Sequence, residues 1–264
     1  MKPGLAFIKK EWMEMFRSGK MTILLILFVL FGIMSPALAK LTPALYEMVA
    51  DSMKEQGITI SQIEVTALTS WTQYFKNAFM ELIVLVCMFS GILTNEYQKG
   101  TLIPMYTRGL SRGSVLFAKM ITTLTAWTLC YYLCFGITYA YNAYFWDNDI
   151  VSHLALSVFC LYLLGVWLIT VIFAISALLS SGTAVMLATG GIFAGLYFVS
   201  LIPKISKYLP VTLLNAGDLV TGNSSIKPGT AFTEDTCLPA IIVTLVLCVF
   251  NYVIAGVLLK RKRV

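Results

Sequence analysis

Charged residues are scarce in this sequence, and their scarcity excludes a soluble globular domain. Asp, Glu, Lys and Arg make up only 12% of the 264 residues, whereas 58% are hydrophobic and the mean hydropathy is +0.82. Soluble domains carry about 25% charged residues. The composition therefore predicts an integral membrane protein.

Side chains suited to catalysis are also scarce. His153 is the one histidine, and no G-x-x-x-x-G-K-[ST] sequence is present to hold ATP. The six cysteines lie in or beside apolar stretches, where cysteine behaves as a small apolar residue. Cys130 and Cys134 are one helical turn apart but lack an acidic partner on that turn. We expect no enzyme activity, cofactor or metal site on this chain.

Long apolar stretches are what the sequence has instead. Crossing the hydrocarbon takes about 20 apolar residues in a helix, and the stretches are too long and too unalternating for a β-barrel. We therefore predict an all-α protein with six transmembrane helices. They cover residues 21–39, 77–94, 115–141, 153–179, 184–203 and 237–259.

The N-terminal residues 1–20 do not resemble a cleaved signal peptide, because they are rich in charged residues. The span that follows them is also longer than the hydrophobic region of a signal peptide. Apolar residues at helical spacing within 5–18 predict an amphipathic helix in the headgroup plane, with Trp12 and Phe16 as anchors. The alternative is a plain extension of the first span.

The basic residues predict the orientation. With the N-terminus inside, thirteen of the nineteen Lys and Arg residues fall in cytoplasmic segments. The positive-inside rule therefore places both termini in the cytoplasm of a plasma-membrane protein. This basic excess serves topology and contact with anionic lipid, and it does not indicate nucleic-acid binding.

Two outer segments are longer than simple turns. In 40–73, the Thr42–Pro43 pair predicts a new helix, and the capping-box sequence Ser61 to Glu64 predicts a second one that feeds span two. We interpret 40–73 as an outer helical hairpin. In 204–236, the stretch VTLLNAGDLVTG predicts a short re-entrant or interfacial helix.

Glu81 is the only acidic residue inside a predicted span. Such residues are costly in a membrane and often functional. Glu81 could contact substrate or act as a gate in the outer vestibule, or it could be a carboxylate that snorkels or is hydrogen-bonded near the interface. Asn77, one turn earlier, could donate a hydrogen bond to it.

The loop 95–115 is the one cytoplasmic segment large enough to bind a partner. It combines apolar residues with Lys99, Arg108 and Arg112, and Ser111 can cap the following helix. Exposed apolar residues in a basic frame favour a docking surface. A loop associated with lipid headgroups is the alternative.

The sequence NEYQKGTLIPMYTRGLSRGSVLFAK, residues 95–119, resembles the permease subunits of type-2 ABC exporters, as do IKKEWMEMFRSGK near the start and the basic tail KRKR. The resemblance implies that this segment contains a coupling helix that enters a groove on a separate ATPase. The residues implied in coupling are Glu96, Gly100, Thr101, Tyr106, Arg108, Ser111, Arg112 and Lys119.

The resemblance implies a permease that works as a homodimer or with a related permease, above two ATPase subunits that bind ATP and Mg. The spacing Gly191-x-x-x-Gly195 permits close packing of a helix from a second copy or from the same chain. Aromatic and Met-rich spans favour an amphipathic or hydrophobic cargo such as a peptide, lipid-like molecule or drug. The alternatives are a membrane scaffold or immunity protein and an ion-coupled carrier.

Overall fold

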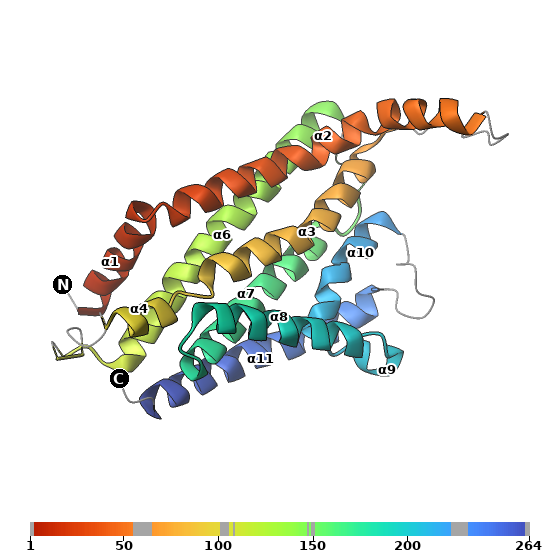
Figure 1. Ribbon diagram of the computed structural model, residues 1–264. Helices are drawn as coiled ribbons and strands as arrows, with labels where there is room; N and C mark the ends of the chain where they lie inside the picture. The colour runs from red at the N-terminus through yellow and green to blue at the C-terminus, as the bar shows by residue number, and fades with distance from the viewer. Residues whose placement is uncertain are drawn as a thin grey trace.

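The computed structural model describes residues 3–54, 65–100, 106–107, 109–146, 148, 151–222 and 232–261. Within these ranges the regular structure is entirely helical. Six helices are long and apolar enough to cross a membrane, which confirms the predicted number. They lie side by side as a bundle, and both chain ends lie at the same end of it (Figure 1). We call this the terminal end and the other the distal end.

The N-terminal helix is separate from the first span, as predicted. Helix α1 (Pro3–Arg17) ends at a turn in which Gly19 adopts φ +73°, a left-handed conformation that glycine reaches without a Cβ penalty. Met13 and Phe16 are exposed, whereas Phe7, Glu11 and Met15 are buried. The buried face of this amphipathic helix therefore includes a carboxylate.

The first span continues well beyond its predicted end. Helix α2 (Lys20–Lys54) runs without interruption through Thr42 and Pro43, so the prediction of a new helix at this pair is wrong. The Thr42 hydroxyl donates to the carbonyl of Leu38, 2.7 Å away, one turn back in the same helix. The predicted capping box at 61–64 lies outside the described residues.

Proline inside α2 is tolerated because another helix covers the backbone group that it exposes. Pro36 has no N–H to donate to the carbonyl of Gly32 four residues earlier. The Thr138 hydroxyl of α6 donates to that carbonyl at 3.0 Å. The absence of a side chain on Gly32 permits this contact, since a Cβ there would lie 2.9 Å from the carbonyl oxygen of Cys134. The Gly32 carbonyl is therefore hydrogen-bonded, as a backbone polar group inside a membrane needs to be.

The other spans follow the predicted order. They are α3 (Ala67–Phe89) with its continuation α4 (Thr94–Lys99), α6 (Arg112–Phe145), α7 (Leu154–Leu178), α8 (Gly182–Val199) and α11 (Glu234–Arg261). The span containing α3 begins about ten residues before its predicted start, because residues 67–76 join the same helix.

Helix α7 is the centre of the bundle. Its span is 78% buried within the protein, against 11% for α8 and 17% for α11, and it packs on α3, α6, α8 and α11. The contact with α6 is unusually close, because Trp127 lies directly over Gly165 and donates from Nε1 to the carbonyl of Tyr162 at 3.2 Å. Helices α8 and α11 expose most of their apolar surface on the outside of the bundle.

The segment between α8 and α11 folds onto the distal end of the bundle. It contains α9 (Pro203–Ser206), the 3-10 helix η1 (Pro210–Gly217) and α10 (Asp218–Thr221). The apolar residues of η1 are buried against α3, α7 and α11. The predicted short helical structure is present, and its position relative to the membrane stays a prediction.

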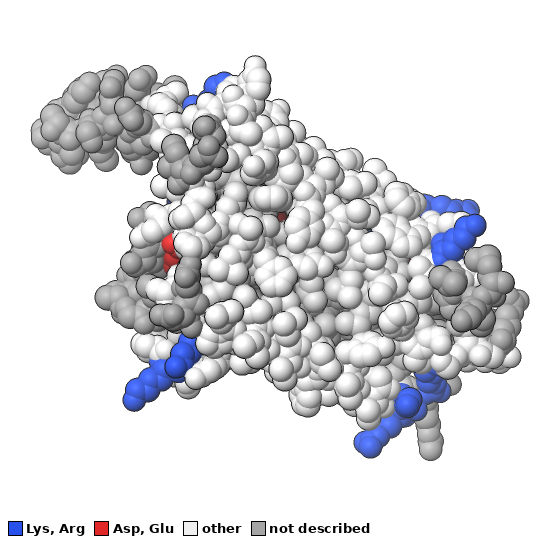
Figure 2. All heavy atoms as spheres, turned by 180° about the vertical axis from the view of Figure 1, so that it is seen from behind, with Lys and Arg blue, Asp and Glu red and all other residues white. Residues whose placement is uncertain are grey.

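The exposed charged side chains on one face of the molecule gather near its two ends. Figure 2 shows Lys and Arg side chains at both ends of one face, separated by a broad band with almost no charged atoms. This distribution is that expected of a protein whose middle faces hydrocarbon.

Candidate functional site

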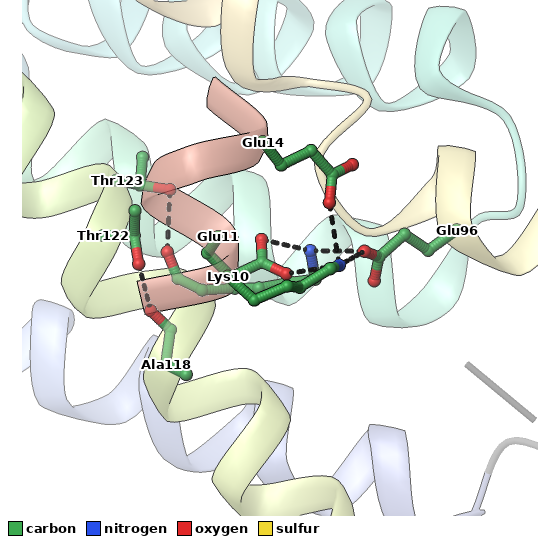
Figure 3. A network of polar contacts seen from close by, with 8 residues as sticks. Lys10, Glu11, Glu14, Glu96, Ala118, Thr122 and Thr123 are labelled. Carbon is green, nitrogen blue, oxygen red and sulfur yellow. Dashed lines mark hydrogen bonds and ion pairs between the residues drawn. The ribbon is translucent and has the colours of Figure 1, made fainter. Parts of the chain in front are cut away.

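The most concentrated polar structure in the described chain is a buried ion-pair network at the terminal end. Lys119 of α6 is 2% exposed. Its Nζ lies 2.7 Å from Oε2 of Glu11 in α1 and 2.9 Å from Oε1 of Glu96 in α4 (Figure 3). One ammonium group therefore joins three helices that are far apart in the sequence.

A second lysine extends the network toward solvent. Lys10 Nζ lies 2.7 Å from Glu14, 3.1 Å from Glu11 and 3.3 Å from Glu96. Burial by itself lowers the pKa of Lys10, but hydrogen bonds and charge attraction from these carboxylates outweigh it and raise the pKa above its usual range. Partial burial likewise raises the pKa of Glu14, and the attraction of Lys10 outweighs it and lowers that pKa.

Local packing holds the network in place. On α6, Lys119 follows the buried residues Val115 and Ala118, which form an apolar cluster with Phe7 of α1. The hydroxyl of Thr123 donates to the carbonyl of Lys119 at 2.9 Å, one turn along the helix (Figure 3). Since Glu11 and Glu96 are buried, removal of the Lys119 charge would leave these carboxylates with only the partly exposed Lys10 ammonium as a counter-charge.

A cavity of about 440 Å³ lies beside the network, between α1, α4 and the beginning of α6. Oxygens of Glu11, Glu14 and Glu96 lie within 4.8 Å of one another, a spacing that can hold a cation. The ammonium groups of Lys10 and Lys119 already supply positive charge there. The cluster therefore combines three carboxylates with two ammonium groups, and the expected absence of a metal ion at this place stays a prediction.

The structure gives several of the predicted coupling residues internal positions. Glu96 is 7% exposed and belongs to the network, and Gly100 ends α4 with φ +65°. Ser111 caps α6 as predicted, since its hydroxyl accepts from the backbone N–H of Ser114 at 3.1 Å. Lys119 is too deeply buried to touch a separate protein in this conformation. Its part in coupling would therefore be indirect.

Arg112 binds within the chain. Its Nη1 donates to the carbonyls of Leu259 at 3.0 Å and Lys260 at 3.1 Å, near the C-terminal end of α11. Such carbonyls have no intrahelical donor, so a guanidinium stabilises them. The guanidinium also lies 5.5 Å from the centre of the Tyr106 ring. Thr101 and Arg108 lie outside the described residues, and their predicted contacts stay predictions.

Glu81 is buried within the protein. It is 1% exposed and about four turns from the beginning of α3, so its side chain does not snorkel to solvent. Its carboxylate is hydrogen-bonded instead, and its depth relative to the membrane interface stays a prediction. The Cys134 thiol donates to its Oε1 at 3.3 Å. Asn77 donates to the hydroxyl of Ser35 at 3.1 Å rather than to Glu81. Whether Glu81 contacts substrate stays a prediction.

An apolar groove separates α3 from α8. Two adjoining cavities of about 260 and 410 Å³ share Phe79, Phe193 and Ala194 in their walls. The two phenylalanine rings are 6.2 Å apart. The Thr189 hydroxyl is buried in this wall and has no hydrogen-bond partner in the described part of the chain. The groove therefore offers an apolar surface with one polar group.

Gly191 and Gly195 lie on the exposed side of α8. A Cβ added at either position would meet no atom of the described residues within 4 Å. No helix of the described part of the chain therefore packs against this pair. The exposed pair leaves a smooth helix surface available to lipid or to a second copy.

Six membrane-length helices and charges gathered at the ends define a polytopic helical membrane protein, and the groove and ion-pair network are features that a transport subunit can use. A family model described as "ABC-2 family transporter protein" matches residues 5–234. The chain therefore belongs to the ABC-2 family of membrane transporter components. This confirms the family resemblance predicted from residues 95–119.

A curated relative covers most of the same length. The chain is 26% identical over 226 residues to a protein named uncharacterized transmembrane protein YxlG, from Bacillus subtilis (strain 168). The match covers 81% of this chain and 83% of the relative. This similarity to a transmembrane protein agrees with a membrane subunit.

Proposed function

We propose that this chain is the permease subunit of an ATP-driven exporter in the plasma membrane, with both termini in the cytoplasm. Two separate ATPase subunits, which bind ATP and Mg, supply the energy. Membership of the ABC-2 family supports this assignment. The excess of basic residues at the terminal end supports the orientation.

The observation that carries the proposal is the ion-pair network behind the loop 95–115. Lys119 bonds to Glu96 in α4, immediately before the loop, and lies in α6, which begins after it. Glu11 ties the same ammonium to α1. Displacement of the loop by an ATPase would therefore move α1, α3 with α4, and α6 together, as a rigid-body transition requires.

The groove between α3 and α8 is the proposed cargo path. Its walls are apolar and aromatic, with Phe79 and Phe193 facing each other across it. Ligand sites of this kind bind mainly through burial of apolar surface, and a few polar groups set the orientation. An amphipathic or hydrophobic cargo matches this lining, with the Thr189 hydroxyl as an available polar contact.

A second copy of the permease is proposed to pack on α8. Replacing both Gly191 and Gly195 with Leu should weaken dimerisation about tenfold, because the side chains block close helix approach. The fraction of dimer in detergent, measured by sedimentation, checks this. Gly136→Leu in α6 is the matched control, since it too meets no atom within 4 Å. An unchanged dimer fraction in the double variant would place the interface elsewhere.

The proposed function is tested by reversing one charge in the loop. Arg108→Glu should weaken binding of the proposed ABC ATPase partner about tenfold and remove the stimulation of that ATPase by the permease. Arg108 is preferred to Arg112, since Arg112 also stabilises the end of α11. Lys207→Glu, at the distal end, is the matched control and should leave binding unchanged. Normal ATPase binding by the Arg108 variant would reject the coupling-loop assignment.

A further inference from the structure

Two cysteines from different helices meet near the distal end of the bundle. The Sγ atom of Cys160 in α7 lies 3.3 Å from that of Cys237 in α11. Both side chains are buried, at 0% and 1% exposure. Cys160 belongs to the second turn of α7, and Cys237 to the first turn of α11. The two thiols therefore face each other where these helices begin.

The packing around the pair fixes this approach. Helices α7 and α11 form the most extensively packed pair among the described elements, and η1 packs on both. Ala240, one turn after Cys237, is fully buried in the same core. A covalent S–S bond is about 2.05 Å long, so the two sulphur atoms need to approach by only about 1.3 Å. Small side-chain rotations supply that movement.

We propose that Cys160 and Cys237 form an intramolecular disulfide in the membrane-inserted protein. The proposal rests on the orientation given in the proposed function, which puts the distal end outside the cytoplasm. Disulfides form and persist at oxidising cell surfaces, whereas cytoplasmic thiols stay reduced. Cys160 and Cys237 are the pair of thiols that meet, whereas the Cys134 thiol donates to Glu81.

The oxidant is a protein disulfide of the thiol–disulfide oxidoreductase class outside the membrane. The Cys237 thiolate attacks one sulphur of that disulfide and forms a mixed disulfide, and the other sulphur leaves as a thiol. The Cys160 thiolate then attacks the Cys237 sulphur and expels the second thiol of the oxidant. Two thiols lose two protons and two electrons, and the oxidant gains them. Since both cysteines are buried in the finished fold, the exchange occurs before α11 has packed.

The bond would close a loop that contains α8, α9, η1 and α10. It would join two helices that already pack as one unit, so movement between α3 and α8 along the proposed cargo path is left free. The disulfide is therefore a structural bond that holds the 204–236 segment on the distal end, rather than a switch for transport.

The test is peptide mapping of the full chain in its native membrane. Membranes are precipitated in acid to stop thiol exchange, free thiols are alkylated in denaturant so that buried thiols also react, and the protein is digested without reductant. The expected result is a peptide pair joined through Cys160 and Cys237 that separates on reduction. It should persist in Cys248→Ser, a matched change on α11, and disappear in Cys237→Ser. Alkylation of both Cys160 and Cys237 in the acid-trapped, denatured sample would overturn the proposal.

A second arm separates failure of the disulfide from failure of the orientation. Lys207→Cys, made in a Cys160→Ser/Cys237→Ser background, is treated on intact cells with a membrane-impermeant maleimide. Labelling confirms that the distal end is outside the cell. If Cys160 and Cys237 are nevertheless reduced in the wild-type chain, the disulfide proposal is wrong and the proposed orientation still stands. Without labelling from outside, the proposed orientation is wrong and the disulfide proposal falls with it.

Discussion

Lys119→Met should cost about 3–5 kcal/mol of stability and abolish ATP-driven transport. Methionine fits the space of the lysine but leaves the buried carboxylates of Glu11 and Glu96 without the cation 2.7 and 2.9 Å away. Removing one partner of a buried ion pair is strongly destabilising, because an uncompensated charge stays in a poorly solvated place. Thermal unfolding in detergent, followed by the loss of monodisperse protein, measures the effect.

Two matched variants show whether charge compensation is the cause. Lys10→Met removes a lysine of the same cluster whose side chain is 36% exposed, and it should cost well under half as much. Combining Lys119→Met with Glu11→Gln and Glu96→Gln removes all three charges and should restore much of the stability. If Lys119→Met alone unfolds at the wild-type temperature, the network does not hold the helices together.

Gly165→Ala should destabilise the bundle by about 3 kcal/mol or more, although it adds a single methyl group. An added Cβ would lie 2.2 Å from a ring carbon of Trp127, which is far shorter than any contact between non-bonded carbon atoms. The buried indole must therefore move, which breaks its hydrogen bond to the Tyr162 carbonyl and separates α6 from α7. The fraction of protein that survives heating in detergent checks this prediction.

The control for Gly165 is a glycine with open space. Gly190→Ala in α8 meets no atom within 4 Å, and it should leave stability unchanged or raise it slightly, because alanine favours helix. Adding Trp127→Phe to Gly165→Ala, which shortens the ring, should recover part of the loss. Equal stability of the Gly165 and Gly190 variants would show that α6 and α7 are not in close contact.

Most of the fold could be predicted because one physical requirement dominates it. A span needs about 20 apolar residues, and each of the six predicted stretches falls on one long helix. The end of α2 could not be predicted in this way. Thr42–Pro43 has the local pattern of a helix start, and Pro36 has that of a break. Tertiary partners decide such cases, and the Thr138 hydroxyl that satisfies Gly32 is more than a hundred residues away.

The candidate site was only partly predictable for the same reason. Glu96 and Lys119 were identified through the family resemblance, but their ion pair and the third member, Glu11, depend on how α1 packs. One signal was present in the sequence. Lys119 lies one turn after Val115 on the apolar side of α6, and a lysine in such a position needs a buried partner.

The most direct measurement is transport of a fluorescent apolar cargo by the purified chain in liposomes, with and without the proposed ABC ATPase partner. We expect cargo movement only when both proteins and MgATP are present, with ATP hydrolysis that rises when the permease is added. Cargo movement by the permease alone, driven by an ion gradient and without a nucleotide, would contradict the proposal that a separate subunit supplies the energy. That result would favour an ion-coupled carrier.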